Sequence, residues 1–254
     1  MSKCTLKPFI IACLITIQFI VNSVYAAEEN PNSLADIWIV IPNAGQQEAF
    51  QTAFKKHLAF RVAKGDPQNW KTYVPIVGDN LNRYVVRFCC TKFNDIENYN
   101  KWESDNKVQD NWNQYVDQYV AKYEHYFSRV DAENSQWPKD SSHFKYFAVT
   151  HYNEKMGKGK SIETGKKLIS DTAKAMNWPY SWSWGWQIGG RGGLTLVIPY
   201  KNYAGMTPPE KSFTKAMKEH LGDDAKVDKI FKQWASNFRS TSYTVYRLVD
   251  ELSM

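Results

Sequence analysis

The stretch Ser181-Trp-Ser-Trp-Gly-Trp-Gln-Ile-Gly-Gly-Arg-Gly-Gly-Leu-Thr-Leu-Val-Ile-Pro-Tyr200 has the pattern of two strands joined by a tight turn. Residues 181–188 and 194–200 are rich in aromatic and β-branched side chains, which favour extended backbone. Gly189-Gly-Arg-Gly-Gly193 lies between them and supplies the backbone freedom that a hairpin turn requires. The stretch therefore predicts a β-hairpin.

A similar hairpin occurs earlier in the chain. Residues 71–78 and 83–92 read as strands separated by Gly78-Asp79-Asn80. Pairs of similar residues recur in the same order around the two hairpins: Asn69-Trp70 with Asn177-Trp178, Val77-Gly78 with Ile188-Gly189, Phe93 with Tyr203, and Arg129-Val-Asp131 with Leu248-Val-Asp250. Their order and nearly constant spacing predict two diverged copies of a unit of about 110 residues.

Each copy has the order strand, helix, strand, strand, helix, strand. In the first copy the predicted strands are 36–42, 71–78, 83–92 and 123–131, with helices through Phe50–Val62 and Val108–Tyr119. In the second they are 143–152, 181–188, 194–200 and 241–249, with helices through Ile162–Met176 and Phe213–Trp234. Such a βαββαβ unit forms an antiparallel sheet with both helices on one face, and its other face must be covered.

Two such units can cover each other, and this pattern resembles the dimeric α+β barrel superfamily. That superfamily includes the antibiotic-biosynthesis monooxygenases, the EthD-like and NIPSNAP-like proteins and the chlorite-dismutase-like haem proteins. The resemblance implies an α+β fold in which two tandem ferredoxin-like units, with antiparallel sheets, form one barrel within a single chain. The expected division is a signal peptide at 1–26, a first repeat at 27–134, a linker at 135–142 and a second repeat at 143–254.

Residues 1–26 have the pattern of a secretory signal peptide. Lys3 and Lys7 precede an apolar run, and Val24-Tyr-Ala26 fits a signal-peptidase site. A lipoprotein acylated at Cys13 and a retained N-terminal anchor are the alternatives. We expect an exported protein, periplasmic or secreted, without a stable membrane span after cleavage.

Composition and charge exclude several classes. The chain has 254 residues, of which 43% are hydrophobic and 15% aromatic, so it is not a disordered protein. Removal of residues 1–26 takes away two lysines and no acid, which lowers the net charge from +6 to +4. Such a mild charge without a basic cluster argues against nucleic acid as a partner. Cys89 and Cys90 are adjacent on a predicted strand, and we expect two buried thiols there rather than a disulfide.

The most unusual feature is the aromatic face of residues 181–188. Trp182, Trp184 and Trp186 share one face of the strand, and small Ser and Gly residues share the other. Large aromatic side chains in such a row serve either as core or as the wall of a small-molecule pocket. We take Trp182, Trp184, Trp186, Tyr152 and Arg87 as candidate ligand-binding residues, because a buried Arg87 would need an acidic partner or an anionic ligand.

Catalytic signals are weak. His151, at the end of a central strand, is a candidate base or haem ligand, and Arg191 is its candidate partner by the resemblance to chlorite dismutases. No spacing typical of a metal site occurs in the sequence, so no metal is expected.

Three functions remain open. The first is an exported small-molecule-binding protein with an aromatic-lined pocket, whose partner is a small hydrophobic or aromatic molecule. The second is an enzyme of the same superfamily, either a cofactor-independent monooxygenase or isomerase or a haem enzyme. The third is a structural or assembly protein without a pocket. No cofactor is expected in the first reading, haem is the alternative, and the protein could form homo-oligomers.

Overall fold

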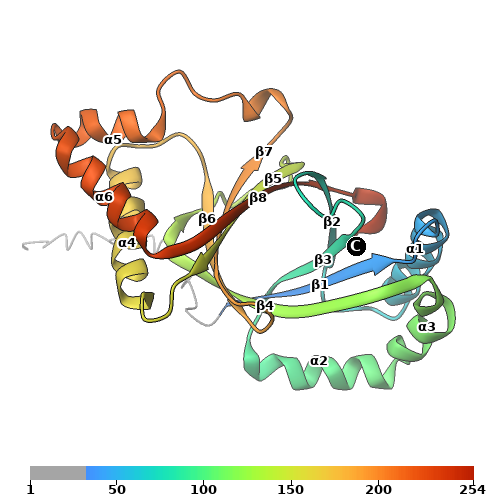
Figure 1. The fold of residues 1–254 in the computed structure, drawn as a ribbon. Helices are drawn as coiled ribbons and strands as arrows, with labels where there is room; N and C mark the ends of the chain where they lie inside the picture. Colours follow the sequence, from blue (N-terminus) through green and yellow to red (C-terminus); the bar gives the residue numbers. More distant parts are fainter. Residues whose placement is uncertain (1–32) are drawn as a thin grey trace, which may run out of the picture.

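The computed structural model describes residues 33–254 and shows one closed barrel of eight antiparallel strands (Figure 1). The strands are β1 (Leu34–Pro42), β2 (Lys71–Val77), β3 (Tyr84–Thr91), β4 (Val120–Gln136), β5 (Tyr146–Glu154), β6 (Trp182–Ile188), β7 (Leu194–Tyr200) and β8 (Phe238–Leu248). The helices are α1 (Gln47–Ala63), α2 (Phe93–Asp105), α3 (Val108–Tyr115), α4 (Gly159–Ala175), α5 (Phe213–Leu221) and α6 (Asp224–Ser236). Short 3-10 turns are η1 (Asp117–Tyr119), η2 (Ala204–Met206) and η3 (Asp250–Leu252).

The strand order repeats in the two halves of the chain. The first half forms the sheet β4-β1-β3-β2 and the second forms β8-β5-β7-β6, which is the ferredoxin-like order in both. The two sheets meet edge to edge, through β2 with β8 and β4 with β6, and so close the barrel. The predicted fold class, two tandem βαββαβ units in one α+β barrel, is confirmed.

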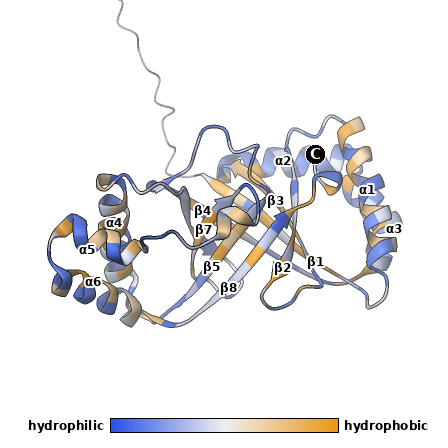
Figure 2. Ribbon diagram, turned by 90° about the horizontal axis from the view of Figure 1, so that it is seen from above, coloured by the Kyte–Doolittle hydropathy of each residue, from blue (hydrophilic) through white to orange (hydrophobic). Residues whose placement is uncertain are grey.

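Helices cover the barrel on its outside. Figures 1 and 2 show α1, α2 and α3 at one end of the molecule and α4, α5 and α6 at the other, with the strands between them. Because side chains alternate along a strand, each strand contributes one set of residues to a helix-covered core and the opposite set to the barrel interior. The molecule therefore has three separate regions for side chains: one between sheet and helices in each half, and one inside the barrel.

Several elements differ from their predictions. The predicted helix Phe213–Trp234 is divided into α5 and α6 at Gly222 and Asp223. Helix α2 was not predicted, although its apolar residues recur every three positions, at Phe93, Ile96, Tyr99 and Trp102; of the helix only Tyr99 is buried. Strand β4 is longer than expected and runs to Gln136, with an interruption of its pairing to β6 between Asp131 and Gln136. Within this irregular segment, Asn134 and Ser135 are buried and hydrogen-bond to Trp182 and Trp184.

The cysteine prediction was wrong. Cys89 and Cys90 lie at the end of β3, where both side chains are exposed, and they are joined by a disulfide across a cis peptide bond. The apolar pattern of residues 83–92 suggests a buried strand throughout. It does not reveal that the last residues of this strand are exposed to solvent.

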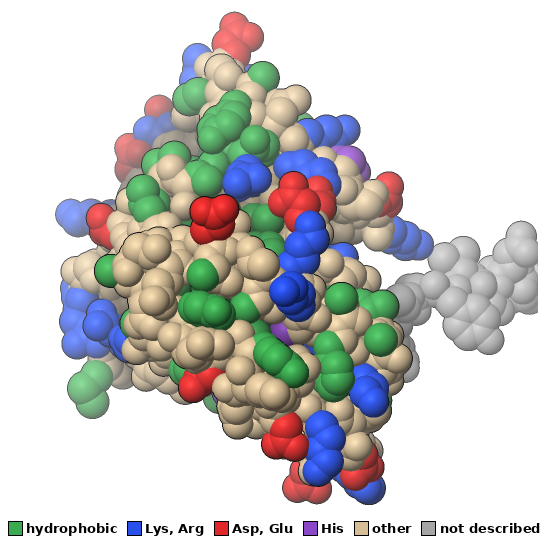
Figure 3. Space-filling view, turned by 90° about the vertical axis from the view of Figure 1, so that its right-hand side faces the viewer, with side chains coloured by type: hydrophobic (Ala, Val, Ile, Leu, Met, Phe, Trp, Pro, Cys, Tyr) green, Lys and Arg blue, Asp and Glu red, His purple; other side chains and the backbone are tan. Residues whose placement is uncertain are grey.

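The signal-peptide prediction falls on residues 1–26, which lie outside the described residues. Within residues 33–254, no helix is long and apolar enough to cross a membrane. The surface over α1 and α3 mixes acidic and basic side chains with separate small apolar patches (Figure 3).

Candidate functional site: an aromatic pocket in the second half

The space between sheet and helices in the second half contains a cavity of about 500 Å³. Its floor is the outer face of β5, β6 and β7, and its walls come from α4, α5, α6 and the two loops that precede β6 and α5. The segment between β7 and α5, which contains Pro208 and Pro209, arches over this space (Figure 1). A cavity of this size, with predominantly apolar walls, is typical of a small-molecule site.

Aromatic rings form most of the wall. The aromatic lining residues are Tyr152, Trp178, Tyr180, Trp182, Trp184, Tyr200, Phe213, Phe231 and Trp234. Neighbouring rings contact each other mainly in tilted and edge-to-face arrangements, such as Trp178 on Phe213 with ring centroids 5.1 Å apart and Trp184 on Trp234 at 5.7 Å. These packed rings hold one another in place, so the wall is preformed.

The position of Trp234 depends on a glycine. Trp234 lies on α6 and packs against α4, where a β-carbon at Gly165 would stand 2.9 Å from the Trp234 ring. Gly165 therefore permits the close approach of the two helices, although glycine weakens a helix interior. Gly165 thus lowers the helix propensity of α4 but allows Trp234 to take its place in the pocket wall.

The indole nitrogens of the floor are satisfied by the protein. Trp182 donates from Nε1 to the carbonyl oxygen of Asn134 at 2.8 Å, and Trp184 donates from Nε1 to Ser170 Oγ at 3.0 Å. Since these polar edges are already bonded, the two rings offer apolar surface to the cavity. A ligand would pack against the rings rather than accept hydrogen bonds from them.

The pocket carries no formal charge. No Lys, Arg, His, Asp or Glu occurs among the described residues that line it. Burial raises the pKa of Tyr152 and of Tyr200, so both phenols stay protonated at neutral pH and can donate hydrogen bonds. The arrangement favours a neutral, largely apolar ligand with a small number of polar atoms.

The structure divides the sequence-predicted binding residues between three places. Trp182, Trp184 and Tyr152 line the pocket. Trp186 shares their face of β6 but lies outside the lining, where it donates to Glu163 Oε1 at 2.6 Å and packs beneath the ammonium group of Lys166. Arg87 lies on β3 and faces the barrel interior, because its neighbours Val86 and Phe88 pack on the helix side.

Lys166 explains the position of Trp186. It is almost completely buried, and it forms ion pairs with Asp131 and with Glu163, the latter at 2.8 Å. Burial alone would raise the pKa of Asp131, but hydrogen bonds from Lys166 and Asn134 hold it below its ordinary value. This charged cluster occupies the end of the outer face of β6 and ends the apolar pocket there.

The two candidate catalytic residues do not reach the pocket. His151 is next to Tyr152 on β5 and therefore faces the barrel interior, where burial lowers its pKa. Arg191 is exposed at the turn between β6 and β7. Neither residue lines the cavity, so the pocket as described offers no histidine or arginine.

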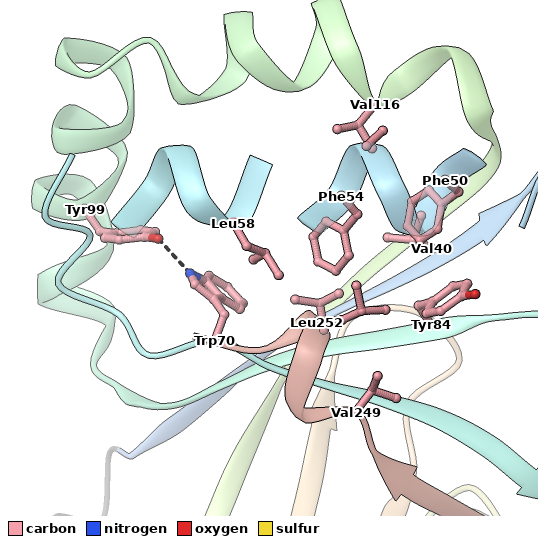
Figure 4. Packing of buried hydrophobic residues seen from close by; sticks show 12 residues of the cluster. Val40, Phe50, Phe54, Leu58, Trp70, Tyr84, Tyr99, Val116, Val249 and Leu252 are labelled. Atoms are coloured by element: carbon pink, nitrogen blue, oxygen red, sulfur yellow. Dashed lines mark hydrogen bonds between the residues drawn. The ribbon is translucent and has the colours of Figure 1, made fainter. Parts of the chain in front are cut away.

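The corresponding space in the first half is filled. Figure 4 shows Phe50, Phe54, Leu58, Trp70 and Leu252 packed between α1 and the sheet. Trp70 donates from Nε1 to the Tyr99 hydroxyl at 2.9 Å. A depression of about 580 Å³ lies on the surface between α1 and η1, and its lining includes the exposed side chains of Glu48 and Lys56.

Several residues of the site were not identified from the sequence. Tyr180, Tyr200, Phe213 and Trp234 come from four elements, and no spacing pattern connects them. A histidine–carboxylate pair was also missed: His125 on β4 bonds through Nε2 to Asp36 on β1 at 2.9 Å, on the outer face of the first sheet. Pairing between adjacent antiparallel strands brings these residues together although 89 positions separate them.

No protein-family model matches the sequence, and the comparison with curated proteins gives no match. Solved structures share the fold. A protein from Fusobacterium nucleatum provisionally named a monooxygenase superposes with a TM-score of 0.53 and 9% identity, over 86% of this chain and 93% of that one. An anthrone oxidase-like protein gives 0.52 and 8%, over 87% and 92%. A mutant chlorite dismutase from Candidatus Nitrospira defluvii gives 0.53 and 6%, over 87% and 93%. At these identities the similarity shows the fold alone.

Haem does not fit the lining residues of this chain. A haem site needs an axial ligand and, for the two propionates, polar or cationic partners. The described lining contains neither histidine nor cysteine, and it contains no cation. The raised pKa values of Tyr152 and Tyr200, caused by burial, oppose phenolate ligation. Within residues 33–254, no cluster of His, Cys, Asp and Glu has the arrangement of a metal site.

Proposed function

We propose that this protein is an exported binding protein for a flat, neutral, apolar or aromatic small molecule, held in the pocket between β5–β7 and α4–α6. The uncharged aromatic cavity of about 500 Å³ carries this proposal. Stacking and edge contacts with the pocket rings would supply most of the affinity, and the protonated phenols would orient the polar atoms of the ligand.

An enzyme of the monooxygenase type is the second candidate, and the shared fold with the anthrone oxidase-like protein favours it. Turnover that begins with proton abstraction needs a base within hydrogen-bond reach of the substrate. The described lining has no carboxylate, lysine or histidine, and its phenols are protonated at neutral pH. The pocket therefore supports binding better than this type of catalysis.

Export is part of the proposal because of two observations. Residues 1–26 have the pattern of a signal peptide, and Cys89 and Cys90 form a disulfide, which is a bond of oxidising compartments. Mass spectrometry of the protein from its own host checks this. A mature chain that begins after Ala26 is expected, and an unprocessed cytosolic chain would contradict export.

The binding proposal is tested by ligand recovery and by paired tryptophan variants. Native mass spectrometry of protein purified from its host should show a retained neutral molecule. A panel of neutral polycyclic and aromatic compounds should then change the tryptophan fluorescence of the wild type in a saturable way. Trp178→Ala, in the pocket wall, should weaken binding about tenfold or more.

Trp38→Ala is the matched control, because Trp38 is a partly exposed tryptophan on the first half, outside the pocket. It should leave binding unchanged. Equal binding by both variants and the wild type would refute the pocket. Oxygen consumption with a bound compound from the panel would instead favour the enzyme.

A further inference from the structure

The interior of the barrel contains a polar cluster that is separate from the aromatic pocket. On β3 the side chains of Tyr84, Val86 and Phe88 pack toward the helices. The alternation of the strand therefore directs Val85 and Arg87 inward. Arg87 and Tyr126 both pair with Ile37 of β1, and Tyr246 pairs with Pro75, two residues from Tyr73, so these side chains share the interior face. Arg83 lies close enough to Tyr126 and Tyr246 to oppose the rise in their pKa that burial causes. We call Tyr73, Arg83, Arg87, Tyr126 and Tyr246 the interior cluster.

The two arginines of this cluster lack acidic partners. Among residues 33–254, no carboxylate forms an ion pair with Arg83 or Arg87. The Nε atom of Arg83 is buried and has no hydrogen-bond partner in this part of the chain. An unpaired guanidinium with a buried donor is unfavourable in a protein interior, because desolvation is not compensated.

Nearby charges do not neutralise the arginines. Glu124 is close enough to Arg83 to have its pKa lowered by it, but the main cause of that lowering is a hydrogen bond from Lys122, at 2.8 Å. Lys71 lies opposite Arg87 on β2, and its ammonium group donates to the main-chain oxygen of Met254. Neither neighbour forms an ion pair with Arg83 or Arg87 in the described part of the chain.

Three phenols complete the cluster. Tyr73 on β2 lies diagonally across the strand pair from Arg87, and the positive charges of both arginines oppose the rise in the pKa of Tyr126 that burial causes. Burial raises the pKa of Tyr73, Tyr126 and Tyr246, although the arginines act in the opposite direction. The phenols are therefore hydrogen-bond donors at neutral pH, and they add donors to those of the two guanidinium groups.

We propose that the barrel interior is a second binding site, in which Arg83 and Arg87 bind a small carboxylate with the help of the three phenols. A guanidinium group presents two parallel N–H donors that match the two oxygens of a carboxylate. An eight-stranded barrel is wide enough for side chains or for one small ligand. Tyr73 and Phe147 are in edge contact, with centroids 5.2 Å apart, so two aromatic rings belong to the same interior face as Arg87.

Sodium benzoate is the probe, with sodium chloride at the same ionic strength as the reference. The mature wild-type protein should show a saturable rise in Tm with benzoate beyond that with chloride. Arg87→Gln should raise the half-saturating concentration about tenfold or more. Arg247→Gln is the matched control, since Arg247 is exposed on the opposite face of neighbouring β8, and it should behave as the wild type.

The two sites are distinguished by crossed variants. Trp178→Ala in the pocket wall should leave the benzoate response unchanged, and Arg87→Gln should leave binding of the neutral pocket ligand unchanged. If Arg87→Gln does not fold, Arg87→Lys and Tyr73→Phe replace it, and each should weaken benzoate binding several-fold. A benzoate response that equals chloride in the wild type, or that survives in all three variants, overturns the proposal. A saturable response to inorganic phosphate alone would overturn the assignment to a carboxylate.

Discussion

The two halves of the barrel use the space beneath their helices in opposite ways. Both halves have the same strand order and a first helix of 17 residues, α1 or α4. In the first half Trp70, Phe54 and the C-terminal Leu252 fill the space (Figure 4). In the second half the space is a cavity with aromatic walls. The same backbone arrangement thus supports either a packed core or a pocket. Which of the two forms depends on the side chains that the segments beyond the strand ends contribute.

The chain after β8 supplies the filling of the first half. Val249 and Leu252 enter the first core, and the backbone N–H of Met254 donates to the carbonyl oxygen of Trp70 at 2.8 Å. At the end of β4, the corresponding strand of the first half, the irregular segment between Asp131 and Gln136 instead lies beside β6, where the carbonyl oxygen of Asn134 accepts a hydrogen bond from Trp182 Nε1. No side chain from that segment enters the pocket lining.

The largest expected effect is on the stability of the filled core in the first half. Trp70→Ala should lower the free energy of unfolding by about 3–5 kcal/mol, because it empties a closely packed core and removes a hydrogen bond to Tyr99. Trp178→Ala, on a wall that already faces a cavity, should cost about 1–2 kcal/mol. Urea unfolding measures both. Equal losses would mean that the second space is packed as tightly as the first.

The second largest expected effect is a pH dependence of stability that arises from His57 in the first half. Burial lowers the pKa of His57 to about 4, from an ordinary value of 6.5, while its hydrogen bond with Asn111 acts in the opposite direction. Protonation is thus easier in the unfolded chain, so stability is lost as the pH falls from about 6.5 toward 4, by about 3 kcal/mol in full. No further loss from this group follows below pH 4.

Chemical denaturation at a series of pH values measures the His57 effect as a difference from His57→Gln. The variant should be less sensitive to pH between about 6.5 and 4 than the wild type. Exposed His220→Gln is the control for loss of an imidazole, and it should follow the wild type. Parallel profiles for all three proteins would show that His57 does not carry the pH dependence.

Adding side-chain volume to the pocket and to the filled core should change the free energy of unfolding in opposite directions. Ile198→Phe adds volume into the pocket from β7 and should stabilise the protein by about 0.5–1 kcal/mol while it blocks ligand binding. Val86→Phe adds similar volume to the filled core from β3, the corresponding strand, and should cost about 1–3 kcal/mol. Thermal unfolding and the fluorescence assay measure the two effects. Destabilisation by both variants would show that the pocket has no spare room.

The last prediction is that haemin does not bind to the pocket. Haemin added to the purified protein should produce no saturable Soret change at stoichiometric concentration, because the pocket lining offers neither a histidine ligand nor a cation for the propionates. Bovine serum albumin serves as a control for nonspecific adsorption of haemin. A sharp Soret band at a one-to-one ratio would restore the haem alternative.

Particular residues show how far sequence reasoning reaches. The hairpin 181–200 and its counterpart 71–92 combine stretches rich in aromatic and β-branched residues with turn residues, and these predict β6–β7 and β2–β3 correctly. Trp182 and Trp184 were placed on one strand face, which the structure shows as the pocket floor. Helix α2 was missed although Phe93, Ile96 and Tyr99 recur every three residues, and Arg87 is not with the tryptophans because it faces the barrel interior.

The sequence by itself determined the order of the strands, the duplication and the alternation of each strand, because these follow from local backbone preference and from hydrophobic period. Only the tertiary structure decided which strand face meets helices and which meets the barrel interior. That choice depends on how the sheets close edge to edge, and it places Tyr152 in the aromatic pocket and its neighbour His151 inside the barrel. Long-range packing also decided that one space is filled and the other open, since the residues that fill the first come from the first half and from the segment after β8.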